Sequence, residues 1–365
     1  MRSFLTRTAL ALVLLSLAHV ADGQTQDKAD RLTRYFETTA VKGNFSGAIL
    51  VAEHGKPLIS KAYGLANAEH KVPNTTKTKF GIGSVTKQFT ASAIMMLQDR
   101  GKLSVSDPID KYLDDIPDQW KGITIHQLLS HTSGLMHSWA LPEFEKTIRI
   151  PATPEQTLAK FKGQPLVFKP GEGFRYSGLG YFILARVIEK VSGSTYDAFL
   201  KENIFVPLGM SDTGSDHPAP VIANRASGYV FSKGHLENAP TMYMPIFSGG
   251  GNLYSTVEDL FRWDQALYST KVVSKKSFAT MTTPVRNHYG YGWEMSEGLG
   301  HRVMAHGGSL PGFTSFIARY VDDQVTIIVL SNVTNIPASQ VSEDLAAVVF
   351  QEGAGSKKER GAKPR

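Results

Sequence analysis

The sequence predicts an α+β fold in which one antiparallel sheet is flanked by N- and C-terminal helices and carries an inserted, mainly helical lobe. Three observations predict it. Stretches rich in β-branched and apolar residues occur near both ends of the 365-residue chain. Helical periodicity, interrupted by Gly, Pro and Ser, fills the part between them, and a further helical pattern stands outside the strands at each end. The sheet is therefore expected to join distant parts of the chain, with the functional site in the cleft between sheet and lobe.

The N-terminal elements are predicted to be a helix and a hairpin. Residues 26–40 have the pattern of a polar-faced helix, and residues 46–53 (SGAILVAE) are typical of a strand. The turn His54-Gly55-Lys56-Pro57 follows, and residues 58–64 continue as a second strand. Two such strands around a short Gly- and Pro-containing turn indicate a β-hairpin.

The middle of the chain is predicted to be helical and irregular. Residues 85–100 place Phe89, Ala93 and Met96 at helical intervals, and Gly101 ends that helix. Residues 103–116, with their Asp and Pro residues, are loop-like. Further helical patterns occur at 123–131, 155–161, 180–191 and 257–268. The helical lobe is accordingly assigned to about residues 100–250.

Strand patterns return near the C-terminus. Residues 314–320 and 325–330 flank a Val321-Asp322-Asp323 turn, and residues 339–350 have the pattern of a closing helix. No internal repeat is visible. The folded part is predicted to be a single catalytic domain, residues 24–350.

Both ends of the chain are predicted to lie outside that domain. Arg2 and Arg7 precede an uncharged run, residues 8–18, and the small-residue pattern Ala21-Asp22-Gly23 follows. This is the pattern of a signal peptide, residues 1–23, cleaved near Gly23/Gln24, which predicts a periplasmic or secreted protein. Residues 351–365 form a basic, Gly-containing tail that is predicted to be disordered. No stable membrane span is expected, because such a span takes roughly 20 consecutive apolar residues.

Charge and cysteine content exclude several classes of function. The formal net charge is +6, but much of the excess lies in residues 1–23 and 351–365, which leaves about +2 for the domain. No basic stripe of the kind that binds nucleic acid is present, so no nucleic-acid partner is expected. The chain has no Cys, which excludes a thiol nucleophile, a disulfide framework and a thiolate metal site.

A Ser and a Lys three residues apart form the first candidate for chemistry. Ser84 and Lys87 stand at the start of the predicted helix in GSVTKQ, and residues three apart on a helix share a face. Burial and the helix N-terminus would both favour a neutral Lys amine able to take the Ser proton. The alternative is that Ser84 only caps the helix and Lys87 projects into solvent. The pattern alone leaves both open.

Other motifs for catalysis or cofactor binding are missing. The glycines at Gly81 and Gly83 do not complete a dinucleotide fingerprint, and the sequence contains no phosphate-binding loop. No Ser lies in the nucleophile-elbow pattern Gly-x-Ser-x-Gly. His126, His131 and His137 are poorly spaced for one helical metal face. No metal site and no cofactor are therefore expected.

Two further stretches complete a recognisable set: FRYSGLGYFILARVIEKVSG (174–193) and AHGGSLPGFTSF (305–316). With SVTK, the chain resembles the serine β-lactamase-like and penicillin-binding-protein-like family, which includes class C β-lactamases, D-alanyl-D-alanine carboxypeptidases, D-aminopeptidases and β-lactamase-fold esterases. The family's motifs are Ser-x-x-Lys, Tyr-x-Asn and Lys/His-x-Gly, and here SVTK, YSG and HGG stand in that order. Connecting segments also match: LLSHTSG (128–134), PLGM (207–210), SGGGNLYSTVEDLFRW (248–263) and YGYGW (289–293). The resemblance runs from about residue 43 to 350 and implies a β-lactamase/transpeptidase-like fold.

The resemblance also implies roles for catalytic residues. Ser84 would be the nucleophile, and Lys87 and Tyr176 would move its proton, with the choice of general base left open. Tyr176 can act as a base only if cationic neighbours lower its pKa, for which Lys87 and a protonated His306 are the candidates.

Backbone and cleft positions follow from the same resemblance. The N–H groups of Ser84 and Ser309 would form the oxyanion hole. Gly307 and Gly308 would leave room for substrate against the strand that carries His306.

Gly178 departs from the family pattern, because it stands where Tyr-x-Asn has its Asn. That Asn binds the Lys and the amide of a peptide or penicillin substrate, and losing such a contact costs about 1 to 3 kcal/mol. An ester, with its better leaving group, depends less on it. We therefore expect an exported serine hydrolase acting on small esters through an acyl-serine. D-alanyl-D-alanine carboxypeptidase, D-aminopeptidase or weak class C-like β-lactamase activity is the alternative, and an acylatable sensor of cell-wall peptides or β-lactams is the non-enzymatic one.

Overall fold

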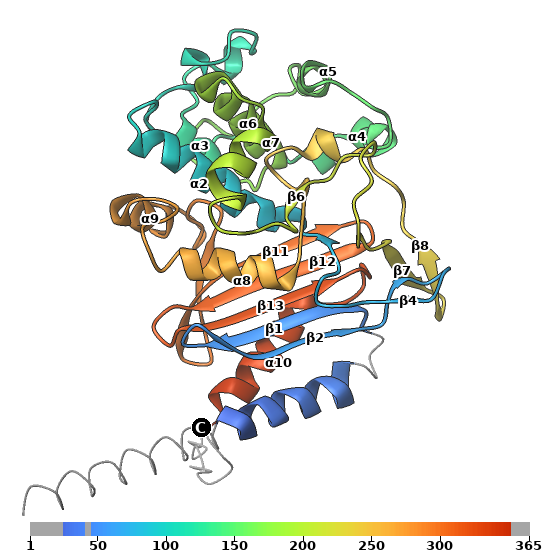
Figure 1. Ribbon diagram of the computed structural model, residues 1–365. Helices are drawn as coiled ribbons and strands as arrows, with labels where there is room; N and C mark the ends of the chain where they lie inside the picture. The colour runs from blue at the N-terminus through green and yellow to red at the C-terminus, as the bar shows by residue number, and fades with distance from the viewer. Residues whose placement is uncertain (1–24, 41–44, 352–365) are drawn as a thin grey trace, which may run out of the picture.

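The computed structural model describes residues 25–40 and 45–351. Its centre is a six-stranded antiparallel sheet in which the two ends of the chain meet, because β1 pairs with β13 from Gly47↔Ser331 to Glu53↔Val325 (Figure 1). The strand order is β10-β11-β12-β13-β1-β2. The strands are β1 (Gly47–Glu53), β2 (Lys56–Tyr63), β10 (Glu294–Gly298), β11 (His301–Leu310), β12 (Phe313–Tyr320) and β13 (Val325–Ser331). The predicted α+β class, with a sheet built from distant parts of the chain, is confirmed.

The hairpin β1–β2 has a tighter turn than the sequence predicts. Only His54 and Gly55 lie in the turn, and both have positive φ, 49° and 73°, as a two-residue turn that matches the twist of the strands requires. Lys56 and Pro57, predicted to be turn residues, begin β2. A Pro is tolerated there because β2 is the edge strand of the sheet.

Strand β13 shows why the sheet needs cover on both faces. All seven of its residues are buried. Ile327 and Val329 belong to the apolar cluster on one face, and Ile328 and Leu330 to the cluster on the other. This alternation with period two means that the sheet is the middle layer of the molecule.

The two terminal helices cover one face together. Residues 25–35 form a helix that continues as the π-helical turn η1 (Phe36–Ala40), and α10 (Ala338–Phe350) lies on the same side of the sheet (Figure 1). Leu32, Phe36 and Leu345 are fully buried in one cluster. The predicted flanking by both terminal helices is confirmed.

The helical lobe covers the other face and is built around α2 (Thr86–Asp99), whose residues from Thr86 to Leu97 are all buried (Figure 1). Helix α2 packs against α6 (Gly178–Ser192). Helix α8 (Val257–Ala266) lies directly on β13 and β1. The remaining helices on this side are α3 (Ile125–Leu129), α4 (Pro142–Thr147), α5 (Pro154–Ala159), α7 (Tyr196–Leu200) and α9 (Lys275–Met281), with short 3-10 or π turns η2 (Gly83–Val85), η3 (Ile109–Lys111), η4 (Asp118–Trp120), η5 (Ser138–Ala140), η6 (Lys201–Phe205) and η7 (Met244–Phe247).

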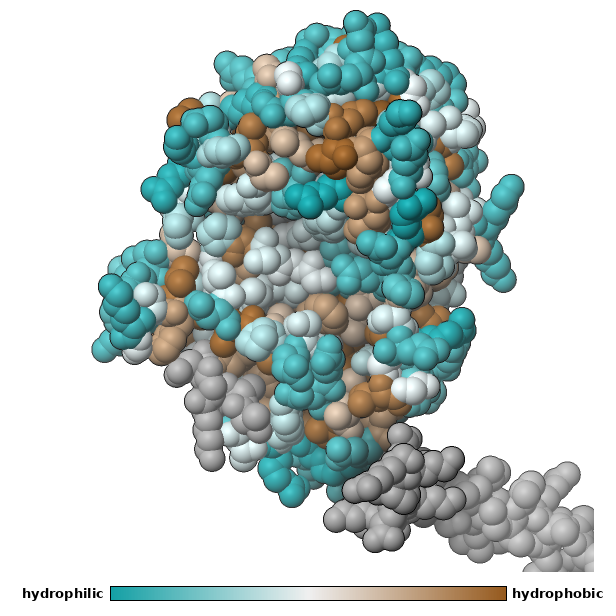
Figure 2. Space-filling view, turned by 180° about the vertical axis from the view of Figure 1, so that it is seen from behind, coloured by the Kyte–Doolittle hydropathy of each residue, from teal (hydrophilic) through white to brown (hydrophobic). Residues whose placement is uncertain are grey.

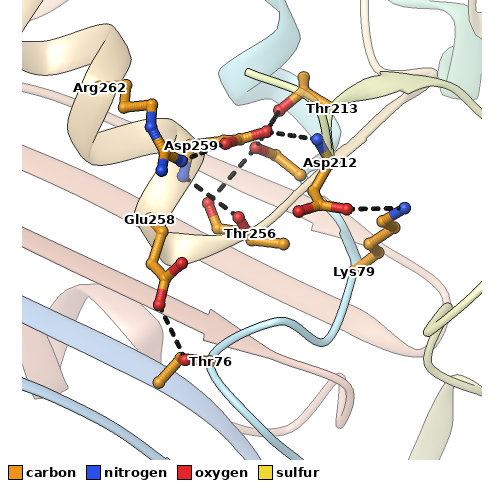
Figure 3. Close-up of polar contacts among 9 residues, drawn as sticks. Thr76, Lys79, Asp212, Thr213, Thr256, Glu258, Asp259 and Arg262 are labelled. Carbon is orange, nitrogen blue, oxygen red and sulfur yellow. Dashed lines mark hydrogen bonds and ion pairs between the residues drawn. The ribbon is translucent and has the colours of Figure 1, made fainter. Parts of the chain in front are cut away.

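A small three-stranded sheet, β5-β9-β6, joins the lobe to the residues just before Ser84. It is held by the carboxylate of Asp259, which is fully buried. Asp259 accepts hydrogen bonds from the Asp212 N–H at 2.8 Å, Thr213 Oγ1 at 2.9 Å and Arg262 Nη1 at 2.7 Å (Figure 3). A buried carboxylate is tolerated when it is satisfied in this way. The minor strands are β3 (Leu65–Asn67), β4 (Val72–Pro73), β5 (Phe80–Gly81), β6 (Gly214–Ser215), β7 (Tyr229–Ser232), β8 (His235–Asn238) and β9 (Leu253–Ser255).

The predicted signal peptide and all of the predicted tail except Gln351 lie outside the described residues. Within residues 25–40 and 45–351, no helix combines the length and the apolar character needed to cross a membrane.

Candidate active site

Ser84 lies in the 3-10 turn η2, directly before α2, where the lobe meets β11. The close approach depends on Gly83, whose φ is +50° and whose side-chain position is 2.8 Å from the backbone N of Ser309. Any Cβ would clash there. Neither η2 nor α2 has a side-chain cap, so the alternative in which Ser84 merely caps the helix is wrong.

Lys87 is buried beside Ser84, with 1% of its surface exposed. Its Nζ lies 3.1 Å from Ser84 Oγ and donates a hydrogen bond to the carbonyl oxygen of Gly250 at 2.7 Å. Burial lowers the pKa of Lys87 from 10.5 to about 7. A neutral amine is therefore accessible near neutral pH, and its lone pair can accept the Ser84 proton.

Tyr176 is the second group at the nucleophile. It lines both cavities beside Ser84, which acts to lower its pKa, and Lys87 Nζ lies 4.8 Å from the centre of its ring. Burial raises the pKa of Tyr176 well above 10 despite these contacts. The condition under which Tyr176 could act as the base, a pKa lowered by cationic neighbours, is therefore not met, and Tyr176 is a neutral phenol that can pass on a proton.

His306 lies on β11 in the wall of the cleft and is 2% exposed. Its Nδ1 donates a hydrogen bond to the carbonyl oxygen of Gly307 at 2.7 Å, so Nε2 accepts from the Tyr289 hydroxyl at 2.9 Å. Burial and the charge of Lys87 lower the pKa of His306 to about 3. The expected protonated His306 is thus corrected to a neutral one with both ring nitrogens bonded inside the protein.

The segment after His306 lies against the nucleophile turn. A Cβ at Gly308 would be 2.1 Å from Ile82 O, whereas one at Gly307 would come no closer than 3.3 Å, to the Phe316 ring. The expectation that Gly308 makes room for substrate is corrected: its missing side chain admits the backbone of Ile82. Because Gly83 meets Ser309 N, the backbones of Ser84 and Ser309 lie at one place, as an oxyanion hole requires.

Gly178 is the first residue of α6 and lines the cleft. A Cβ added there would meet only Ser138 Oγ, at 3.5 Å, an ordinary contact. The backbone thus does not require Gly at this position. The resemblance implied that an Asn at this position would bind the Lys; here Lys87 Nζ donates a hydrogen bond to Gly250 O instead.

Ser84 stands between two cavities. The smaller, with a cavity volume of about 60 Å³, enters the lobe and is lined mainly by apolar side chains, among them Phe144, Phe182 and Phe247. The larger, about 970 Å³, follows β11 and reaches Glu294. In Figure 2 the surface is hollowed between the lobe above and the sheet below.

Sequence reasoning missed several residues of this cleft. Trp139 and His137 line both cavities, and Glu294 lines the larger one. Each follows a matched segment, His137 and Trp139 shortly after LLSHTSG and Glu294 directly after YGYGW, and that proximity was the available signal. Tyr291, which belongs to the YGYGW segment, contacts His126, and its hydroxyl lies 2.5 Å from His126 Nδ1.

No group of three or more His, Cys, Asp or Glu side chains placed to hold a metal ion occurs in the part of the chain that the structure describes. The chemistry assembled at Ser84 is that of a hydroxyl, an amine and a phenol. These are the groups of an activated serine nucleophile.

Comparisons with known proteins agree with this geometry. A family model described as Beta-lactamase matches residues 32–350. Penicillin-binding protein 4* of Bacillus subtilis (strain 168) is 34% identical over 328 residues, which cover 84% of this chain and 72% of that protein. The octameric penicillin-binding protein homologue from Pyrococcus abyssi superposes with a TM-score of 0.78 at 30% identity, covering 88% and 77% of the two chains.

The D-amino acid amidase from Ochrobactrum anthropi SV3 has the same fold, with a TM-score of 0.78 at 21% identity over 88% of this chain and 98% of that one. The family match spans both the sheet and the lobe, and it includes all three groups at the nucleophile. The chain therefore belongs to the serine β-lactamase and penicillin-binding-protein family and is a serine hydrolase.

Proposed function

We propose that this serine hydrolase is a carboxylesterase that cleaves small esters with an apolar acyl group. One observation carries the proposal: the pocket beside Ser84 is apolar, and the position that binds substrate amides in the family motif is Gly178, which has no side chain.

The smaller cavity suits an acyl chain. Its apolar wall comes from η5, α4, the residues after α5, α6, η7 and the end of β11. It consists of Trp139, Phe144, Phe161, Leu179, Phe182, Ile246, Phe247 and Leu310. An acyl group placed there gains roughly 25 cal/mol for each Å² of apolar surface removed from water. Size and apolarity would therefore select the acyl group.

Ester cleavage needs less from the protein than amide cleavage does. An alkoxide leaves more readily than an amine, so the missing amide contact at Gly178, worth about 1 to 3 kcal/mol, matters least for an ester. Peptide carboxylates and β-lactam carboxylates would also need a cation. Among the described residues lining the larger cavity, no Lys or Arg is present.

The proposed mechanism assigns one task to each group. The neutral amine of Lys87 takes the proton of Ser84 as Oγ attacks the ester carbonyl. The N–H groups of Ser84 and Ser309 stabilise the negative oxygen that forms. Tyr176, a neutral phenol beside Ser84, relays the proton held by Lys87 to the departing alkoxide, and water then cleaves the acyl-serine by the reverse path.

The export predicted from residues 1–23 is part of the proposal. The mature protein should be recovered from the periplasm or the medium, with Gln24 as its first residue by N-terminal sequencing. Recovery of the intact chain in the cytoplasm would contradict this location.

A panel of three substrates tests the function: a short-chain nitrophenyl ester, a chromogenic cephalosporin and a D-Ala-D-Ala peptide. The ester should have the highest kcat/KM, and Ser84→Ala should abolish turnover of all three. Ser106→Ala, at an exposed serine outside both cavities, should leave turnover unchanged. A clear preference for the peptide or the cephalosporin would overturn the proposal.

A further inference from the structure

The larger cavity begins where strand β10 ends. Glu294, the first residue of β10, pairs with Ala305 on β11. Beyond that pair, residues 306–310 of β11 pair with β12 on one side and have no partner in β10. Glu294 therefore stands at the start of the free strand edge that runs past Ser84.

Glu294 is the one Asp, Glu, Lys or Arg among the described residues that line the larger cavity. The two imidazoles in the wall are neutral at pH 7, because burial, with the charge of Lys87, lowers the pKa of His137 to about 4 and that of His306 to about 3. The first turn of α10, at Pro337 to Ser339, adds only the partial positive charge of a helix N-terminus. The formal charge of the wall is thus negative.

The carboxylate of Glu294 is unpaired in the part of the chain that the structure describes: no hydrogen bond or ion pair to its side chain is present among those residues. Its charge nevertheless acts at the catalytic centre. After burial, it is a cause of the raised pKa of both Tyr176 and Tyr289. Glu294 is exposed to solvent at the rim of the cavity, and partial desolvation raises its pKa.

Aromatic residues contribute to the same wall. Trp139, Tyr176 and Phe316 line the cavity together with Glu294, and 43% of the surface of Trp139 is exposed. A carboxylate and an aromatic ring in one cavity can both attract an ammonium group, through charge attraction and cation–π contact.

We propose that the larger cavity is an ammonium subsite, in which Glu294 and Trp139 bind a cationic amine on the leaving group of the ester. The inference rests on the proposed function, because that function decides which part of the ester each cavity binds. The apolar cavity takes the acyl group, so the alcohol part occupies the remaining space at Ser84. The substrate class is then esters of amino alcohols, and substrates that place a carboxylate in this cavity are repelled.

Two esters of the same shape test the subsite: butyrylcholine and the uncharged dimethylbutyl butyrate in which carbon replaces the quaternary nitrogen. The native protein should prefer the cationic ester in kcat/KM by about tenfold. Glu294→Gln should reduce that ratio to about one. Glu297→Gln is the matched control, because Glu297 is exposed on the same strand and does not line this cavity.

The outcomes separate the two proposals. Equal kcat/KM for the two esters in the native protein, or a ratio that survives Glu294→Gln, overturns the subsite and leaves the esterase intact. Preference for the cephalosporin or the peptide overturns the esterase. Competitive inhibition by choline is then measured on whichever substrate is turned over, and its loss in Glu294→Gln but not in Glu297→Gln supports the subsite. Thermal unfolding of each variant verifies that it is folded.

Discussion

At the scale of single residues, the protonation state of Lys87 controls the chemistry. Its pKa is held at about 7 by burial, and only the neutral amine can accept the Ser84 proton. We expect kcat/KM for a neutral ester to rise with pH through about 7 and then level off, as measured by initial rates from pH 5 to 9. A profile that is flat across this range, or that falls, would contradict the role of Lys87 as the base.

The same burial should make Lys87 a source of instability. Its folded pKa lies about 3 units below its unfolded value, so the unfolded chain binds more protons between pH 7 and about 10, and stability rises with pH over that window. Below pH 7 Lys87 is fully protonated in the folded protein, and its burial lowers the free energy of unfolding by on the order of 4 kcal/mol. Lys87→Met should therefore raise Tm at pH 6 by several degrees while kcat falls at least a hundredfold. An unchanged or lower Tm in calorimetry would refute the argument.

Gly178 should control which acyl compounds react. Its Cβ position has only an ordinary contact with Ser138 Oγ, so Gly178→Asn is expected to fold and to regain the amide contact of the family motif. Acylation by a chromogenic cephalosporin should become about ten- to a hundredfold faster, as followed by stopped-flow absorbance. Gly178→Ala fills the space without an amide and should show no gain. Equal rates for the two variants would remove Gly178 from the account of specificity.

At the scale of elements, the contact between η2 and β11 positions the nucleophile. A Cβ at Gly308 would displace Ile82, two residues before Ser84, whereas one at Gly307 would meet only the edge of Phe316. Gly308→Ala should lower kcat by about a hundredfold, because a shift of roughly 1 Å has that effect on reacting groups. Gly307→Ala is the matched control and should stay within a few-fold of the native rate. Similar kcat values for the two variants would show that the close approach is unimportant.

Elements with a strong apolar pattern could be predicted from the sequence, and others could not. Residues 325–330 are apolar except for Thr326, and β13 forms within one residue of the predicted end. Strand β10 (EMSEG) and most of β11 (HRVMAHGGSL) lack such a pattern. The strand conformation of β11 depends on pairing with β12, and that of β10 on pairing with β11; these tertiary interactions override local propensity. Short helices such as α4 and α7 were missed because five or six residues show too little periodicity.

The candidate site divides in the same way. Ser84, Lys87 and Tyr176 could be predicted because the family motifs contain them, and the structure brings the three together. The neutral state of His306 could not be predicted, since it follows from burial and from the charge of Lys87 in the folded structure. The position of Glu294 could not be predicted for a related reason: it lies in the cleft because β10 begins at Glu294, opposite Ala305 of β11.

At the scale of the whole molecule, the sheet joins the two ends of the chain, and the lobe supplies the other wall of the cleft. Ser84 and Lys87 come from the lobe side at α2, Tyr176 from the residues before α6, and Ser309 from the sheet. Because these groups are separated by up to 225 positions along the chain, the site exists only in the folded domain. The reaction that this assembly performs is accordingly the central claim.

That claim is tested most directly by trapping the acyl-enzyme. The protein is mixed with butyryl nitrophenyl ester, quenched in acid within milliseconds and analysed by intact mass and peptide mapping. The account predicts one butyryl group per chain, on the peptide containing Ser84, absent from Ser84→Ala and accumulating in Lys87→Met only at a much lower rate. A butyryl group on another residue, or undiminished ester turnover by Ser84→Ala, would contradict it.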